Sequence, residues 1–368
     1  MRAVICGGGV IGASIAYFLG RRGVKAIVIE RTELACAASG KSGGFLARDW
    51  CDGTPLEALS RRSFDLHAQL PDDIGGDWGY RRLTTYGGFS GAKTGGGAGG
   101  CDIGWLSPGV AVNRRLGSTA TTAQVHPREF TRALMDAARA QGAELRRGRV
   151  MGLRRRDDGA RVTGVDLEGE FLECDAVVIA MGPWSVLAAR WLPLPGVYGL
   201  KGHSLVLMTG TTVPAEALFL EYQQENGDVA TPEVFPRADG TTYVCAISSD
   251  SPLPIDPKAV APDPGAIERL QQMCSGLSPV FARAHVLARQ ACYRPVTADG
   301  LPLIGRVADV EGAYVATGHS VWGILNAPAT GEAVAELIID GSARTIDLSP
   351  FDPGRMAPLE PKRLTGDG

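Results

Sequence analysis

The feature that most constrains the fold is a glycine-rich turn set between two apolar strands at the start of the chain. Residues 2–6 form a short run rich in β-branched side chains, and the turn GGGVIG follows at 7–12. Residues 13–19 have helical composition, and residues 26–29 form a second apolar run that ends at Glu30. A strand, a GxGxxG turn, a helix and a strand ending on an acid together form the fingerprint of a dinucleotide-binding unit.

Each part of this fingerprint has a physical role. Gly7 permits the tight turn, Gly9 lets backbone N–H groups approach a pyrophosphate, and Gly12 lets the helix pack closely on the strand. The helix directs its positive N-terminal end at the phosphates. Glu30 can accept hydrogen bonds from an adenosine ribose. This stretch alone leaves open whether the dinucleotide is FAD or a nicotinamide cofactor.

The composition excludes several classes of function. A formal net charge of −3 offers no basic field for nucleic acid or anionic lipid, and no apolar run is as long as a membrane span. Eight scattered cysteines without a CxxC pair indicate neither a metal site nor a redox dithiol, and they favour a reducing compartment. The first strand begins at residue 2, so we expect no signal peptide and predict a cytoplasmic protein.

The remaining sequence predicts a Rossmann-type domain with a second sheet inserted into it. Apolar spacing predicts helices at 56–70 and 128–141, and buried strands at 144–150 and 176–180 resume the α/β pattern. The segment 84–107 is rich in glycine, and we expect a mobile loop or a lid there.

Between residues 191 and 288 the pattern changes to short alternating strands with frequent prolines, which indicates an antiparallel sheet. We therefore predict an α/β fold, α+β overall, in which a Rossmann-type dinucleotide-binding domain carries an inserted antiparallel-sheet domain. The predicted parts are a nucleotide-binding domain (1–75, 125–190 and 290–345), a substrate-binding domain (76–124 and 191–289) and a C-terminal tail (346–368). We see no internal repeat or coiled coil that would indicate an oligomeric state.

Two motifs near the end of the chain form a second constellation. They are YRPVTADGLPLIG at 293–305 and YVATGHSVWGILNAPATGE at 314–332. The second predicts a buried strand, a glycine loop and a helix from about residue 328, with Asn326 as its N-cap and Gly341 as its C-cap. The N-terminus of such a helix has unpaired N–H groups and a positive dipole end, which would stabilise the negative charge of a reduced flavin.

Taken with the fingerprint, these motifs resemble the D-amino acid oxidase and glycine/sarcosine oxidase superfamily of FAD-dependent oxidoreductases. The resemblance covers nearly the whole chain and includes the small-residue loop at 39–44 and AMGPW at 180–184. It implies FAD as the cofactor, and therefore a Rossmann-type FAD-binding domain with an inserted antiparallel-sheet substrate domain. Sarcosine-oxidase-type members attach their flavin to a cysteine shortly before the last strand, and residues 306–312 contain none, so we expect FAD to be non-covalent.

The resemblance also implies which residues bind FAD. For the adenosine and phosphate end they are Gly7, Gly9, Val10, Ile11, Gly12, Glu30, Arg31, Val150, Gly182 and Trp184. For the loop under the flavin they are Ser39, Gly40, Lys41 and Ser42, and for the flavin ring Gly318, Gly323, Ile324, Leu325 and Asn326.

The implied reaction oxidises the C–N bond of a small amine or amino acid by hydride transfer to the flavin, and the imine is then hydrolysed. The candidate catalytic residues are Arg294, His319 and Trp322. Arg294 matches the arginine that pairs with the substrate carboxylate in amino-acid-oxidising members, or it pairs with Asp299. For His319 the alternatives are a catalytic base and a residue that holds the loop backbone. For Trp322 they are a side chain that closes the pocket and one that packs beneath the last helix.

Further candidates and alternatives remain at this point. Side chains that could reach the site are Arg48, Lys201, His203, Tyr222 and Tyr243. An NAD-linked dehydrogenase would use the same fingerprint but leaves the late motifs without a role. A non-enzymatic assembly protein with a retained FAD fold is the third hypothesis.

Overall fold

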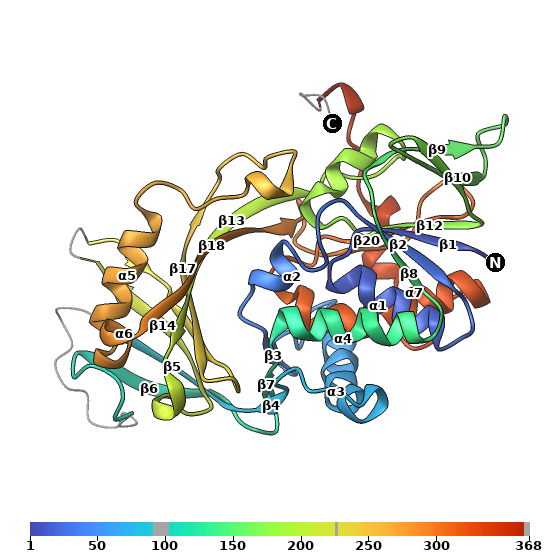
Figure 1. Ribbon diagram of the computed structural model, residues 1–368. Helices are drawn as coiled ribbons and strands as arrows, with labels where there is room; N and C mark the ends of the chain where they lie inside the picture. The colour runs from blue at the N-terminus through green and yellow to red at the C-terminus, as the bar shows by residue number, and fades with distance from the viewer. Residues whose placement is uncertain (91–102, 225–226, 364–368) are drawn as a thin grey trace.

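The computed structural model describes residues 1–90, 103–224 and 227–363, and it has two regions that lie side by side (Figure 1). One is an α/β region and the other is built on a large, mostly antiparallel sheet. The predicted fold class, a Rossmann-type domain with an inserted sheet domain, is confirmed. The predicted mobile glycine run at 95–100 lies outside the described residues.

The α/β region is organised around a six-stranded sheet in the order β19-β20-β12-β1-β2-β8. All neighbouring strands are parallel except the pair β19–β20. The strands are β1 (Ala3–Cys6), β2 (Ala26–Glu30), β8 (Glu144–Arg147), β12 (Ala176–Ile179), β19 (Leu303–Arg306) and β20 (Ala313–Thr317). The central strands β1 and β12 are completely buried, which explains their continuous apolar sequences.

Each face of this sheet has its own core because successive side chains of a strand point to opposite faces. Ile5 belongs to a core that includes residues of four helices, whereas Val4 and Cys6 belong to the core on the other side. The helices are α1 (Val10–Gly20), α3 (Glu57–Ile74), α4 (Pro127–Ala140) and α7 (Gly323–Asp340). The other face is covered by the 3-10 helix η1 (Gly182–Arg190) and a three-stranded sheet of β9 (Val150–Arg155), β10 (Val162–Leu167) and β11 (Glu170–Glu173).

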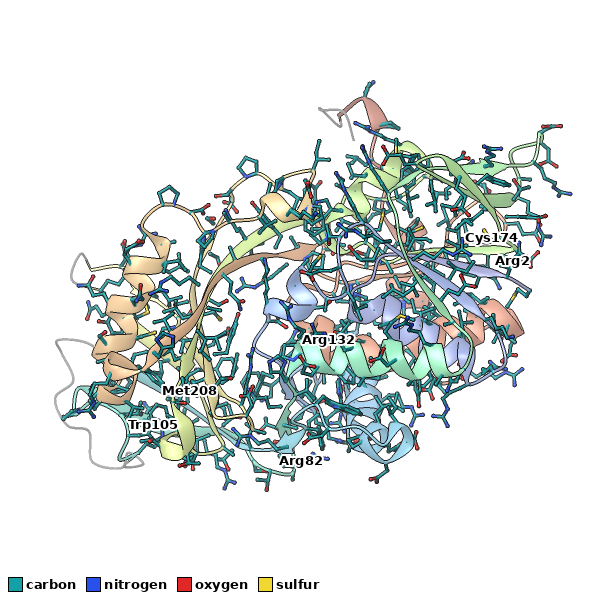
Figure 2. All side chains as sticks on the ribbon, viewed as in Figure 1. Arg2, Arg82, Trp105, Arg132, Cys174 and Met208 are labelled. Carbon is teal, nitrogen blue, oxygen red and sulfur yellow. The ribbon has the colours of Figure 1, made fainter. Side chains whose placement is uncertain are left out.

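The second region is an eight-stranded sheet whose main path runs β18-β13-β17-β16-β14-β5-β6. Its strands are β5 (Thr84–Ser90), β6 (Val110–Gly117), β13 (Tyr198–Met208), β14 (Glu216–Gln223), β15 (Val229–Ala230), β16 (Glu233–Pro236), β17 (Thr241–Ser249) and β18 (His285–Val296). The helices α5 (Ala266–Leu277) and α6 (Pro279–Arg283) cover its outer face (Figure 1). Trp105 packs there against Phe281, with ring centroids 5.5 Å apart (Figure 2).

A short sheet of β3 (Phe45–Ala47), β7 (Thr122–Gln124) and β4 (Arg81–Arg82) links the two regions, and α2 (Ala38–Lys41) lies between them (Figure 1). The prediction of a loop from residue 84 is wrong for its first part, which is strand β5. The glycines there serve close packing, because a Cβ at Gly88 would lie 2.2 Å from the carbonyl oxygen of Ala111. Among the described residues, no helix combines the length and apolar character needed to cross a membrane.

We propose that the chain has the two predicted domains and that one boundary between them lies later in the sequence than predicted. The predicted nucleotide-binding segment starts at residue 290, but β18 runs to Val296 and pairs with β13 along its whole length. The chain therefore returns to the six-stranded sheet only after residue 296.

Helix α7 continues through Pro328, which has no N–H to donate to the carbonyl oxygen of Ile324. His67 of α3 compensates for this loss. Its Nε2 lies 2.9 Å from the carbonyl oxygen of Ile324 and 3.1 Å from that of Leu325. A neutral imidazole with its proton on Nε2 thus satisfies the carbonyls that the proline leaves unpaired.

Two serines of α3 complete this contact. Ser63 Oγ accepts the N–H of Ala329 at 3.1 Å, and the Ser60 hydroxyl donates to Oδ1 of Asn326 at 3.1 Å. The prediction of Asn326 as N-cap is therefore wrong, because the helix begins one turn earlier and its N-cap is Trp322. The sequence signal was misleading since the partners that let the helix pass the proline belong to α3. Gly341 does form the predicted C-cap, with φ +80°.

Replacing Ser63 with Ala should lower the free energy of unfolding by about 1–3 kcal/mol, because the buried N–H of Ala329 loses its acceptor. Urea unfolding of the purified protein measures this change. Ser275→Ala is the matched control, since Ser275 is exposed on α5 and bonds only to its own helix in the described structure. We expect it to change stability by less than about 0.5 kcal/mol. Equal effects of the two changes would contradict the role of Ser63.

His67 should make stability dependent on pH. Burial lowers its pKa from 6.5 to about 4, and this effect exceeds the opposing one of the two carbonyl contacts. The unfolded chain therefore binds a proton that the folded chain does not, so stability is full above pH 6.5 and falls as the pH drops toward 4.

Between about pH 7.5 and about pH 5, the His67→Gln variant should lose about 2 kcal/mol less stability than the wild type does. Urea unfolding at each pH measures the difference. His285→Gln, at an exposed position of β18, should keep the wild-type dependence. An unchanged pH dependence in the His67 variant would refute the assignment.

Candidate active site

One cavity extends from the six-stranded sheet to the inner face of the eight-stranded sheet. At one end it is lined by the segments that follow β1, β2, β12 and β20. These strands are parallel neighbours, so their carboxyl ends meet at one edge, where ligands bind in such sheets. At the other end it is lined by residues of β13, β14, β16, β17 and β18.

The turn after β1 is so closely packed that two of its positions require glycine. Gly7 has φ +119°, and a Cβ there would lie 2.3 Å from the carbonyl oxygen of Ala180. A Cβ at Gly12 would lie 2.0 Å from the carbonyl oxygen of Gly7. The backbone of the turn is therefore free to face the cavity, as predicted for a pyrophosphate site.

The carboxylate of Glu30 is held against this turn. Its Oε2 accepts the N–H of Gly8 at 2.8 Å, and its Oε1 accepts the N–H of Thr32 at 2.8 Å. Arg31 and Val150 line the same part of the cavity. The structure thus places Glu30, which was predicted to bind the ribose, in one cavity with Arg31 and Val150, which were predicted to lie on the adenosine side.

The loop after β2 closes over the first turn of α1. Ser39 Oγ accepts the N–H of Val10 at 2.9 Å, which satisfies one of the free donors at the helix N-terminus. Ser42 also lines the cavity, and its hydroxyl is buried without a hydrogen-bond partner among the described residues. Arg237 donates to the carbonyl oxygen of Ser42 at 3.0 Å and so fixes this part of the loop.

Most of the predicted residues meet in this cavity. Those that line it are Gly7, Gly9, Val10, Ile11, Glu30, Arg31, Ser39, Ser42, Val150, Gly182, Trp184, Arg294, Gly318, His319, Trp322, Gly323 and Ile324. Gly12, Gly40, Lys41, Leu325 and Asn326 are not among the described lining residues.

These five residues support the cavity wall from behind. A Cβ at Gly40 would lie 2.1 Å from the carbonyl oxygen of Ala35, so this glycine allows the loop to fold tightly. Lys41 extends toward the other sheet and donates to the carbonyl oxygen of Ala291 at 3.2 Å. Leu325 and Asn326 are buried inside α7.

The late loop turns at Gly318, which has φ +80°. His319 follows, and its Nε2 lies 3.1 Å from the hydroxyl oxygen of Thr330 on α7. Burial lowers the pKa of His319 to about 3, so the ring is neutral at physiological pH. These contacts favour the alternative that His319 holds the loop rather than acting as a base.

Trp322 has contacts with both the cavity and the core. It lines the cavity and also packs against the core beneath α7. Its ring stands nearly perpendicular to Trp50, with centroids 6.4 Å apart and an interplanar angle of 88°. Gly323 and Ile324 form the start of α7 at the cavity, where the first N–H groups of the helix have no intrahelical acceptor.

Arg294 lies on the inner face of the eight-stranded sheet. Its Nη1 donates to Ser248 Oγ at 3.0 Å, so the guanidinium reaches across β13 to β17. Gly202 leaves the space for it, because a Cβ there would lie 3.3 Å from Nη2 of Arg294. The alternative pairing with Asp299 is wrong, since Arg355 binds that carboxylate with two contacts of 2.7 and 3.1 Å.

Several residues of this wall were missed by sequence reasoning. Besides Tyr243, which was a candidate, the cavity is lined by aromatic side chains and polar groups contributed by Phe45, Trp50, Phe219, Glu233, Phe235, Cys245 and Cys292. The only local signal was the alternation along β16, where Glu233 and Phe235 face one side. Burial raises the pKa of the Glu233 carboxyl, and the nearby Arg294 partly opposes this shift.

The other early candidates do not line the described cavity. Lys201 forms an ion pair with Asp263 at 2.5 Å, and His203 Nε2 accepts the N–H of Asp263 at 3.0 Å. Both alternate along β13 with Gly202, which lines the cavity, so they face away from it. Arg48 pairs with Asp65 at 3.3 Å, and Tyr222 packs beneath α5.

The residues of this cavity fit FAD. The turn at Gly7 presents bare backbone, the loop presents the unpartnered hydroxyl of Ser42, and the start of α7 presents free N–H groups. These donors are spread from the fingerprint to the start of α7, as an extended dinucleotide requires. A nicotinamide dinucleotide would give the late loop no comparable role.

Comparison with known proteins agrees with this assignment. A family model described as FAD dependent oxidoreductase (DAO) matches residues 2–337. An oxidoreductase of Schizosaccharomyces pombe is 30% identical over 384 residues, covering 95% of this chain and 97% of that protein. Glycine oxidase of Geobacillus kaustophilus is 28% identical over 383 residues, covering 94% of this chain and 95% of that protein.

Solved structures show the same fold. The crystal structure of glycine oxidase from Geobacillus kaustophilus superposes with a TM-score of 0.81 at 26% identity, covering 96% of this chain and 99% of that one. L-proline dehydrogenase from P. horikoshii gives a TM-score of 0.78 at 20% identity, covering 96% and 97% of the two chains. With the fingerprint, the late loop and the family match in agreement, the chain belongs to the DAO family of FAD-dependent oxidoreductases, and its cofactor is FAD.

Proposed function

We propose that the protein oxidises the C–N bond of a small amino acid and that Arg294 binds the substrate carboxylate. The observation that carries this proposal is the position of the guanidinium in the cavity. It is held by Ser248, it lies over Gly202, and it forms no ion pair with an acidic side chain in the described parts of the chain. A guanidinium with free donors is suited to a bidentate carboxylate.

The cofactor assignments follow the geometry of the cavity. We propose that the backbone at Gly7 and Gly9 holds the pyrophosphate, that Glu30 binds the adenosine ribose, and that the start of α7 contacts the flavin ring. We also propose that Ser42 donates its hydroxyl, which has no partner among the described residues, to the cofactor. Free N–H groups at a helix N-terminus stabilise negative charge on a bound group.

FAD, when bound, accepts the hydride from the carbon beside the substrate nitrogen. The protein orients the substrate through Arg294, which is how positioning lowers the barrier to such a step. Aromatic side chains around the cavity exclude water from the reacting atoms. His319 is buried, neutral and bound to Thr330, so no proton transfer is assigned to it. The imine product is then hydrolysed.

The relatives support an amino-acid substrate. Glycine oxidase and L-proline dehydrogenase are named for amino acids, and both share this fold. We carry over from them the substrate class alone. All described cysteines are free thiols, which favours a reducing compartment such as the cytoplasm.

FAD should be released when the yellow protein is precipitated with acid, because residues 306–312 contain no cysteine for a covalent bond. The absorbance spectrum of the supernatant measures this release. Flavin that stays with the precipitate would contradict the non-covalent assignment. An anaerobic screen of amines and of D- and L-amino acids then identifies compounds that bleach the flavin.

Arg294→Ala should raise the apparent KM for carboxylated substrates by about 10-fold to 100-fold, because a charge-assisted hydrogen bond is lost. Steady-state kinetics with the compounds found in the screen measure it. Arg289→Ala is the matched control, since Arg289 is an exposed arginine of the same strand. It should leave KM unchanged. Similar KM values for the wild type and the Arg294 variant would remove the carboxylate assignment.

A further inference from the structure

A partly buried acid faces the cavity from the middle of the eight-stranded sheet. Glu233 on β16 is paired in register with Phe219 on β14 and with Cys245 on β17. Residues directly opposite each other in antiparallel strands share a face of the sheet. Glu233 therefore lies on the cavity face, and it lines the cavity together with both neighbours.

The carboxylate of Glu233 has no cationic partner among the described residues. Its hydrogen-bond partner there is the thiol of Cys245, with Sγ 3.5 Å from Oε2. A thiol is a weak donor and does not neutralise a charge. A carboxylate that is removed from water is normally paired with a cation or hydrogen-bonded, because an unpaired desolvated charge has a high free energy. The cavity wall thus carries a negative charge that has no positive partner among the described residues.

Arg294 supplies the matching positive group on the same face. The sheet order β18-β13-β17-β16 puts two strands between Arg294 and Glu233. The guanidinium crosses the first of these strands over Gly202 and bonds to Ser248 on the second. Arg294 acts electrostatically on Glu233 without forming an ion pair with it. The two charges therefore face one cavity with a gap between them.

We propose that Glu233 binds the ammonium group of the substrate while Arg294 binds its carboxylate, so that the site selects zwitterionic amino acids over amines or carboxylates that carry one charge. This inference rests on the proposed function and deepens it. A zwitterion pairs both charges of the wall and adds no net charge to a desolvated cavity. A carboxylate without an amine leaves Glu233 unpaired, and an amine without a carboxylate leaves Arg294 unpaired; both are disfavoured.

Glu233 acts as a specificity residue in this scheme, so its test compares ligands that differ only in the amine. The probes are alanine with propionate and proline with cyclopentanecarboxylate. Dissociation constants are measured by isothermal titration calorimetry on the oxidised FAD enzyme. Where an amino acid reduces the flavin, all ligands are instead compared on enzyme reduced beforehand with dithionite under anaerobic conditions. The wild type should bind each amino acid more tightly than its amine-free analogue.

Glu233→Gln removes the charge and keeps the shape of the side chain. It should weaken amino-acid binding by about 10-fold or more, since a charge-assisted hydrogen bond is lost. It should keep or improve the affinity for propionate and cyclopentanecarboxylate, because an unpaired buried charge is gone. Glu233→Ala is a second variant. Like Glu233→Gln, it should weaken binding of amino acids relative to their amine-free analogues. Flavin content and circular dichroism confirm that each variant is folded.

Two matched changes separate this role from other effects. Glu221→Gln removes a charge from the neighbouring strand β14 at an exposed position that is not among the described lining residues, and it should alter neither affinity. Arg294→Ala should weaken binding of amino acids and of amine-free carboxylates alike. The opposite responses of the Glu233 and Arg294 variants to propionate identify the two ends of the site.

The pH dependence gives an independent readout. Groups facing Glu233 from the packed strands are Tyr243 and Cys245 of β17 and Cys292 and Arg294 of β18. As the pH falls through the raised pKa of Glu233, the carboxylate takes up a proton and wild-type affinity for amino acids should fall. The Glu233→Gln variant should lack that part of the dependence.

The proposal is overturned if the wild type binds amino acids no more tightly than their analogues, or if Glu233→Gln weakens both ligand classes equally. It is equally overturned if the variant binds amino acids as the wild type does. Failure of the proposed function looks different. In that case no amine or amino acid bleaches the flavin of the wild type, whatever the binding measurements give.

Discussion

The candidate site depends on close contact of backbone with backbone at the end of β1. The carbonyl oxygens of Ala180 and Gly7 occupy the positions where side chains of Gly7 and Gly12 would begin. These contacts bring the segments after β1 and β12 together and seat α1 against the sheet. Because no side chain intervenes, a phosphate-bearing ligand can approach N–H groups directly.

Parallel strand order then brings distant segments to the same place. β12 lies between β1 and β20, so the segment after β20 meets the fingerprint although some three hundred residues separate them in the chain. The eight-stranded sheet faces that edge with a wall of its own (Figure 1). The cavity is therefore a product of both sheets, in which one supplies backbone donors and the other supplies charged and aromatic side chains.

The parts of the fold that sequence could predict are those with a local signature. The glycines of the fingerprint, the buried runs of β1 and β12 and the C-cap at Gly341 each follow from a few neighbouring residues. Strand β5 was taken for a loop because its glycines look like breaks, whereas their purpose is a close approach to β6 that only the folded sheet reveals.

Long-range register explains what the sequence could not predict at the site. Glu233 has no motif around it, and its neighbours Phe219 and Cys245 come from other strands. Arg294 could be predicted only through the family resemblance, and its contact with Ser248 depends on a missing side chain at Gly202. The error at Asn326 has the same origin, because the groups that carry α7 past Pro328 belong to α3.

The interruption of α7 has a consequence for how such an enzyme can diverge. His67 and Ser60 of α3 hold the turn before Pro328, and Ser63 and Arg62 of the same helix bind Ala329 and Glu332 beyond it. Helix α1 shares in this packing at Gly331, which lies against Ser14. Helix α3 contributes no residue to the described cavity lining, yet it holds the start of α7 that faces the cavity. Substitutions on α3 can therefore act on the backbone donors of the site while every lining residue stays the same.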